Sequence, residues 1–231
     1  LHFQPGFSAL GNMFFDTTHA HVLHKGGIPH DLIIDEGLDT AAEHPFKGNI
    51  DLNKLEAFIR KEGREKVGLI HITITCNNNG GQPVSMENLR GVRAIADKYG
   101  LPFYLDAARF AENAYFIKQR EPGYENKSIK EIVREMFSYA DGCTMSSKKD
   151  GLVNIGGFLA LKDEGKYRQA QQLLILLEGF VTYGGMAGRD LEALAIGLQE
   201  VLEESYLASR ARQVHLLGNT LLEAGVPAVR P

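Results

Sequence analysis

The sequence contains little cysteine and no cysteine motif. Its two cysteines, Cys76 and Cys143, show no CxxC spacing and no ladder of pairs, which argues against a disulfide framework and against a cysteine metal site. No stretch resembles a signal peptide, and no apolar run approaches the roughly 18 residues that a membrane-spanning helix needs. We therefore expect a soluble protein of a reducing, cytoplasmic compartment, with no membrane partner.

A basic patch is also missing. The formal net charge is -4, and Lys and Arg are spread along the chain, so neither a nucleic-acid surface nor a polybasic membrane signal is indicated. At 231 residues, of which 44% are hydrophobic, the chain can bury a sizeable core. These features favour one large domain that binds a small molecule.

Apolar strand-like runs alternate with helix-period segments from about Asp51 onward. This alternation predicts an α/β fold with a mostly parallel sheet flanked by helices. Helices are expected after Asp51, after Pro83 up to Gly100, and after Ser128, where Glu131 completes a capping box. Strands are expected over residues 67–75, 102–105, 142–145 and 157–161. A long helical tail is expected over 188–223, with a break near Gly197 or Gly218.

Neither end has the pattern of a complete domain. Residues 1–10 show no clear period, and 1–4 are candidates for a non-native segment. Residues 226–230 resemble the start of a strand that has nothing to pair with. We therefore expect an irregular segment over 1–10, one large domain over 11–224, a truncated further domain from 225 to 231, and a longer parent protein.

Polar residues follow three of the expected strands. The first strand is followed by Asn77–Gly81, the second by Asp106 and Arg109, and the third by Ser146–Asp150. In open α/β sheets, ligands bind beyond the carboxyl ends of the strands. The sequence therefore predicts that these groups surround one anionic, aromatic cofactor.

Pyridoxal phosphate has chemical demands that match this set. It needs a lysine amine for a Schiff base and a carboxylate at its pyridine nitrogen, which Lys149 and Asp106 can supply. Asn77 and Arg109 are placed to stabilise its phenolic oxygen, and Ser146 to donate to its phosphate. We predict that these residues form its binding site.

Each of these residues also has a purely structural interpretation. Asp106 could cap a helix that starts near Ala107, Asn77–Gly81 has turn chemistry whatever its function, and a Lys148–Lys149 pair is more often solvated. If Lys149 is the functional amine, the charge of Lys148 favours loss of its proton. The order of the whole set on successive strand ends favours the functional interpretation.

A histidine cluster offers a competing site. Four histidines lie close together in the sequence beside two aspartates: His19, His21, His24, His30, Asp16 and Asp31. Such a group could ligate zinc. The spacing fits no zinc motif, so a solvated loop is the favoured interpretation.

Several longer stretches resemble the β-eliminating lyases, the family of tryptophanase and tyrosine phenol-lyase. They are residues 80–85 (GGQPVS), 106–118 (DAARFAENAYFIK), 145–150 (MSSKKD), 154–157 (NIGG) and 183–189 (YGGMAGR). The resemblance runs from about Gly11 to the end of the chain. It implies the fold-type I, aspartate-aminotransferase-like fold, with 11–224 as the pyridoxal-phosphate-binding large domain and 225–231 as the start of a truncated small domain.

The resemblance also implies roles for single residues. Lys149 would form the Schiff base beside Lys148, and Asp106 would face the pyridine nitrogen. The other cofactor contacts would be Asn77, Arg109, Ser146 and Phe15, the last stacked on the ring. The backbone carbonyl of Asn154 would contribute to a site for potassium or a similar monovalent cation. Because the family shares its sites between subunits, a homo-oligomer, a dimer of dimers, is implied, with Tyr183 near its interface.

Two activities fit the resemblance. Asp16 in the stretch 15–18 favours tryptophanase, which splits L-tryptophan into indole, pyruvate and ammonium, because a carboxylate can accept from the indole N–H. Residues 108–112 also resemble tryptophanase, whereas 142–145 and 152–154 resemble tyrosine phenol-lyase, which releases phenol from L-tyrosine. We expect a carbon–carbon lyase for an aromatic amino acid, with tryptophan as the favoured substrate.

An inactive cofactor-binding fragment is the remaining alternative. The family pattern includes a phosphate-binding Gln-Gly-Arg stretch, a potassium-binding Glu and an Arg that binds the substrate carboxylate. The resemblance finds no counterpart for them among the 231 residues. Spectroscopy after addition of pyridoxal phosphate would distinguish such a fragment from an active lyase.

Overall fold

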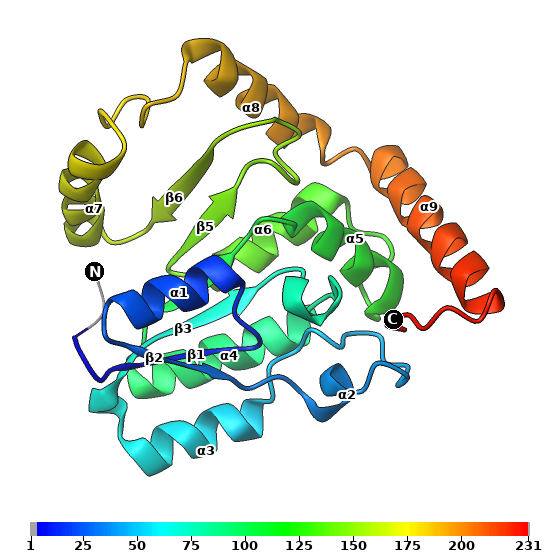
Figure 1. The fold of residues 1–231 in the computed structure, drawn as a ribbon, viewed down its shortest axis with the longest axis horizontal. Coiled ribbons are helices and arrows are strands. Elements are labelled where there is room, and N and C mark those ends of the chain that lie inside the picture. The colour runs from blue at the N-terminus through cyan, green and yellow to red at the C-terminus, as the bar shows by residue number, and fades with distance from the viewer. Residues whose placement is uncertain (1–3, 231) are drawn as a thin grey trace.

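The computed structural model describes residues 4–230, which contain one six-stranded sheet in the order β2-β1-β3-β4-β5-β6 (Figure 1). The strands are β1 (Ser8–Gly11), β2 (Ile28–Asp31), β3 (Val67–Thr73), β4 (Phe103–Asp106), β5 (Gly142–Ser146) and β6 (Gly157–Leu161). All neighbouring pairs are parallel except β5 and β6, which are antiparallel. The mostly parallel α/β sheet predicted from the sequence is confirmed.

Helices cover both faces of this sheet (Figure 1). They are α1 (Asp16–His24), α2 (Asp35–Leu38), α3 (Leu52–Glu62), α4 (Met86–Tyr99), α5 (Phe110–Arg120), α6 (Ile129–Ser138), α7 (Glu164–Leu177), α8 (Gly188–Glu200) and α9 (Glu204–Glu223). Two short 3-10 turns, Arg64–Lys66 and Asn77–Asn79, flank β3. No helix in the described part of the chain is long and apolar enough to cross a membrane.

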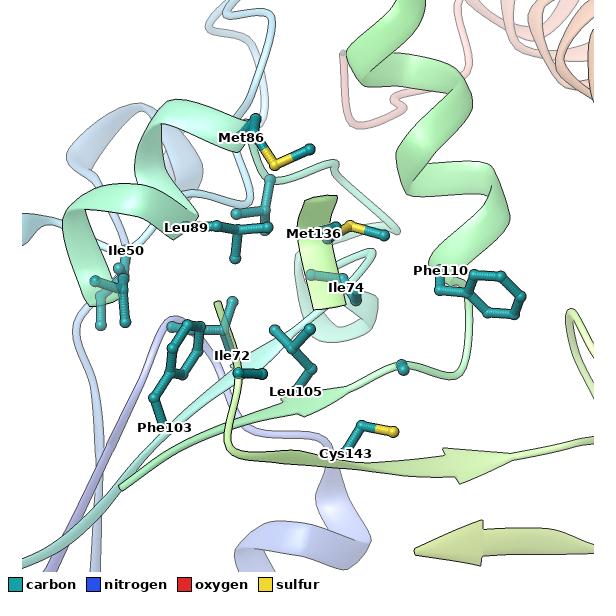
Figure 2. Packing of buried hydrophobic residues seen from close by; sticks show 14 of the residues in the cluster. Ile50, Ile72, Ile74, Met86, Leu89, Phe103, Leu105, Phe110, Met136 and Cys143 are labelled. Carbon is teal, nitrogen blue, oxygen red and sulfur yellow. The ribbon is translucent and has the colours of Figure 1, made fainter. Parts of the chain in front are cut away.

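The main core lies between the sheet and helices α3 to α6 (Figure 2). Alternate side chains of β3 and β4 point into it, including Ile70, Ile72, Phe103 and Leu105, which are fully buried. Burial of one such side chain contributes about 1.5–3 kcal/mol. On the other face a smaller cluster of Ala9, Phe14 and Val22 packs under α1. The α1 face is therefore only thinly covered, and polar side chains of the sheet lie there.

The predicted helix caps are confirmed. The Asp51 carboxylate accepts from the backbone N–H groups of Asn53 and Lys54 at 2.9 and 3.0 Å. Ser128 and Glu131 form the reciprocal capping box at the start of α6. These caps satisfy backbone donors that a helix leaves free at its first turn. Local side-chain chemistry therefore fixes where α3 and α6 begin.

The helical tail differs from its prediction. It breaks at residues 201–203, between α8 and α9, and not at Gly197 or Gly218. Gly197 lies inside α8, where a Cβ would collide with the carbonyl oxygen of Gly151. This glycine serves close packing and does not end the helix.

The ends of the chain also differ from the expected pattern. Residues 8–10, within the segment expected to be irregular, belong to β1, and 226–230 form no strand. Strand β3 ends at Thr73, two residues earlier than predicted. The expected non-native residues 1–4 lie outside the described part except for Gln4, as does Pro231.

Candidate active site

A cavity of about 480 Å³ opens at the carboxyl ends of β3, β4 and β5. Its walls come from the segment before α1 and from the loops that follow the three strands. The lining includes most of the predicted site residues: Phe15, Asn77, Asp106, Arg109, Ser146, Lys148 and Lys149. Asp16 and Asn154 are not part of it. Parallel strands bring these residues together because their carboxyl ends meet at one edge of the sheet.

Lys149 lies in the loop that follows β5. Its Nζ donates to the Ser146 Oγ at 2.9 Å and lies 5.8 Å from the centre of the Phe15 ring. Burial lowers the pKa of the Lys149 amine, and the positive charges of Arg109 and Lys148 lower it further against the opposing effect of Asp106. A lysine in this environment loses its proton more readily than a solvated one.

Asp150 fixes the loop that carries Lys149. The Asp150 carboxylate accepts from the backbone N–H of Ala111 at 2.7 Å and of Glu112 at 3.3 Å, in the first turn of α5. Its own backbone N–H donates to the Ala108 carbonyl at 3.2 Å. Burial raises the pKa of Asp150 to about 7. These contacts join the Lys149 loop to the start of α5, and sequence analysis did not identify them.

Asp106 ends β4 between two threonines. It lies opposite Thr73 of β3 and Thr144 of β5 in the sheet register. One carboxylate oxygen accepts from the Ala108 N–H at 3.2 Å. Asp106 therefore does both things: it stabilises the turn after β4 as an acceptor, and it lines the cavity.

The segment of Phe15 is held over the cavity by a neighbouring loop. The Asn78 side-chain amide donates to the Phe14 carbonyl and to an Asp16 carboxylate oxygen, both at 2.9 Å. The Phe14 N–H donates to Asp31 at 2.9 Å. Asp16 is thus exposed at the rim of the site, outside the lining, and Phe15 lies inside it.

A second cavity of about 330 Å³ adjoins the first. Thr75, Asn77 and Arg109 line both, and α5 and α9 supply the outer wall. Across that wall the Arg210 guanidinium donates twice to one Glu112 oxygen, at 3.0 and 2.9 Å. The joined space has room for a second small molecule beside the first.

The strand threonines were missed by sequence analysis. Thr73, Thr75 and Thr144 line the main cavity, but threonine is common in strands and their pattern indicated only β structure. The Thr75 Oγ1 is buried and has no hydrogen-bond partner among residues 4–230. A buried hydroxyl without a partner is rare, which marks this wall as a place for a ligand.

The histidine cluster does not form a site in the described residues. His19, His21 and His24 are exposed on α1, and His30 lies on β2, 3.1 Å from the Ser8 hydroxyl. In residues 4–230 no group of three or more His, Cys, Asp or Glu side chains is placed to hold a metal ion. Asn154 is exposed in the loop between Lys149 and β6.

Comparison with known proteins relates this chain to one enzyme family. The β-eliminating lyase family model matches residues 2–230. The tryptophanase of Salinibacter ruber is 58% identical over 98% of this chain and 48% of its own length. The tyrosine phenol-lyase of Symbiobacterium sp. is 52% identical over 99% of this chain and 50% of its own length. The chain spans about half the length of the curated relatives it matches.

A solved structure supports the fold. The crystal structure of a complex between SepCysS and the SepCysE N-terminal domain superposes with a TM-score of 0.58, over 96% of this chain and 54% of that chain. The two sequences are 18% identical. At this identity the likeness concerns the fold alone, and it agrees with the mostly parallel sheet.

Proposed function

The chain belongs to the β-eliminating lyase family, and from that premise we propose that it carries the pyridoxal-phosphate centre of a carbon–carbon lyase for an aromatic amino acid. Its fold is that of the fold-type I enzymes that use this cofactor. One observation carries the proposal: Lys149, Asp106 and Arg109 line one cavity at the carboxyl ends of the strands.

The residues present fit the cofactor. Arg109, Lys148 and Lys149 give the cavity a positive charge against the single carboxylate of Asp106, which suits an anionic phosphorylated ring. The buried Thr75 Oγ1 lacks a partner in the described part of the chain. A lysine whose pKa is lowered by burial and neighbouring cations suits covalent attachment of an aldehyde.

We assign the contacts as follows. Lys149 Nζ attaches the cofactor, Asp106 holds a proton on the pyridine nitrogen, and Phe15 stacks on the ring. Arg109 and Asn77 stabilise the ring oxygen. Ser146 and Lys148 are assigned to the phosphate side of the site, Ser146 as a hydrogen-bond donor.

When bound, pyridoxal phosphate supplies an electron sink for negative charge at the substrate Cα. Asp106 supports this chemistry by keeping the pyridine nitrogen protonated. Lys149 would hold the cofactor aldehyde, and its Nζ would be positioned to move a proton at the substrate Cα. The Phe15 ring forms part of the cavity wall, 5.8 Å from the Lys149 Nζ.

We propose tryptophan as the substrate and tyrosine as the alternative. Asp16 at the cavity rim offers a carboxylate acceptor for an indole N–H. The test is to incubate the full-length protein and pyridoxal phosphate with each amino acid in turn. Indole and pyruvate from tryptophan are expected. Phenol from tyrosine would establish the alternative, and no pyruvate from either would refute the lyase assignment in favour of an inactive cofactor-binding protein.

The proposal includes a monovalent cation, potassium by family resemblance, near the backbone carbonyl of Asn154. Asn154 is exposed on the loop that follows Lys149. Retention of the cofactor in potassium and in a bulky organic cation would be compared. Equal retention would exclude the cation from the site.

The proposed function also includes assembly into a homo-oligomer and a location in the cytoplasm. Leu176, Leu177 and Phe180, in and after α7, expose 79, 76 and 64% of their surface, as apolar groups at subunit interfaces do before assembly. Both cysteines are free and buried, which suits a reducing compartment. Light scattering of the full-length protein tests the assembly.

A further inference from the structure

We infer that His71 is a positioning residue for Asp106, holding the carboxylate that faces the pyridine nitrogen of the cofactor. The cofactor part of this inference rests on the proposed function. The contact between the two side chains does not, and it can be tested without any ligand.

The sheet register places the two residues on the same face. His71 of β3 lies opposite Tyr104 of β4, and Thr73 lies opposite Asp106. Because alternate side chains of a strand share a face, His71 and Asp106 are diagonal neighbours on adjacent strands. Residues so placed are close enough for an aromatic side chain to interact with its neighbour. This face is the one that α1 covers.

The imidazole of His71 is fixed in place. Only 6% of the residue is exposed. Its ring stacks on that of Phe14, with centroids 5.9 Å apart and planes 13° from parallel. The next residue, Phe15, lines the cofactor cavity. The aromatic segment before α1 therefore holds His71 behind the cavity and presents Phe15 inside it.

One ring nitrogen of His71 is left without a partner. The Nδ1 is buried and forms no hydrogen bond to any residue in the range 4–230. Buried polar nitrogens are nearly always hydrogen-bonded in folded proteins. The negative charge of Asp106 acts on the imidazole, since it raises the His71 pKa against the larger lowering by burial. A bridging water, or a small shift of the ring into direct contact, would let Asp106 supply the partner that the His71 Nδ1 lacks.

The surroundings keep the imidazole neutral. Burial lowers the pKa of His71 below its ordinary value of 6.5. His71 lines a cavity of about 310 Å³, and the polar groups that share this space are Thr18 and His21 of α1, Lys25 just after α1, Tyr104 of β4 and Thr144 of β5. A neutral imidazole can donate one hydrogen bond to the Asp106 carboxylate without forming an ion pair with it. Such a hydrogen bond would hold the carboxylate in one orientation, as an acceptor for the protonated ring nitrogen must be.

The first test needs no cofactor. Nitrogen-15 NMR follows the His71 ring in the parent chain and in Asp106→Asn. Loss of the carboxylate should lower the His71 pKa further and change the signals of its ring nitrogens. His30, on β2 and influenced by Glu62 and Asp31, should show neither change. Unchanged His71 signals in Asp106→Asn would overturn the inference.

The second test measures affinity for pyridoxal phosphate by its visible absorbance. His71→Leu, which cannot donate, should bind about tenfold more weakly or worse, as expected for one lost hydrogen bond to a charged group. His71→Asn keeps a donor and should recover part of that loss. His30→Asn is the matched control and should bind like the parent.

The outcomes separate the two proposals. Parent affinity in a folded His71→Leu chain would overturn the positioning role. If this variant fails to fold, His71→Asn and the NMR measurement decide. Failure of the parent itself to bind pyridoxal phosphate would refute the proposed function, and the NMR result would still decide whether His71 contacts Asp106.

Discussion

The Nζ of Lys149 donates to the Oγ of Ser146 across 2.9 Å. In this contact the Ser146 hydroxyl accepts, so its own O–H stays free to donate to the cofactor phosphate that we assign to it. The residue that we assign to attachment and the residue that we assign to phosphate recognition are therefore in direct contact.

Ser146→Ala should weaken binding of pyridoxal phosphate by about twofold to tenfold, the effect of one hydrogen bond. Ser147→Ala is the matched control, since the Ser147 Oγ is buried, lacks a partner in the described chain and lies outside the cavity lining. Titration followed by absorbance measures both. Equal affinities in the two variants would remove Ser146 from the site.

Asp16→Thr in the full-length protein should shift substrate preference from tryptophan towards tyrosine. The carboxylate is replaced by a hydroxyl, which can donate to a phenol oxygen as well as accept. The ratio of kcat/KM for the two amino acids should change by about tenfold, as expected for one hydrogen bond to a charged group. An unchanged ratio would remove Asp16 from substrate recognition.

Asp150 should make stability depend on pH. Its folded pKa of about 7 lies above the ordinary value of 3.8, so the folded state retains a proton that the unfolded state releases. This stabilisation is complete below the unfolded pKa and is lost as the pH rises through about 7.

Asp150→Asn cannot ionise and should escape that loss. Its free energy of unfolding relative to the parent should rise by roughly 3 kcal/mol between about pH 4.5 and pH 8. Urea unfolding at the two pH values measures this difference. A constant difference between the two proteins would contradict a raised pKa at Asp150.

Lys47 should be important for stability although it lies outside the cavity. It is fully buried, and its Nζ donates to the carbonyl oxygens of Asp39, Ala42 and Arg230, each at 2.8 Å. Lys47→Ala leaves these carbonyls without a donor and should cost about 3 kcal/mol. Lys54→Ala, which breaks an exposed pair with Asp35, should cost less than about 1 kcal/mol. Urea unfolding measures the free energy of unfolding of both variants and of the parent.

Local signals explain what the sequence predicted well. Asp51 and Ser128 cap helices through partners within three residues. The starts of α3 and α6 can therefore be identified from the local sequence. The gathering of the candidate site residues around one cavity was predictable for a related reason. Parallel topology converts the order of Asn77, Asp106 and Lys149 along the chain into proximity at one edge of the sheet.

Long-range contacts explain what the sequence did not reveal. His71 looks like one polar residue in a run of strand formers, and its stacking partner Phe14 is far away in the chain. In the sequence Lys47 looks like an ordinary surface lysine, because one of its acceptors, the Arg230 carbonyl, is distant in the chain. Strands β1 and β2 have four residues each and include Gly11 and Pro29, too little pattern to identify a strand.

The central claim is that Lys149 is the attachment point of the cofactor. The most direct test is to incubate the chain with pyridoxal phosphate, reduce the product with borohydride and map the modified peptide by mass spectrometry. We predict that the phosphopyridoxyl group is found on Lys149 and that Lys149→Ala loses both this label and the visible absorbance. Lys130→Ala, which changes an exposed lysine of α6 outside the cavity lining, keeps them. Labelling at another lysine, or absorbance retained in Lys149→Ala, would contradict the account.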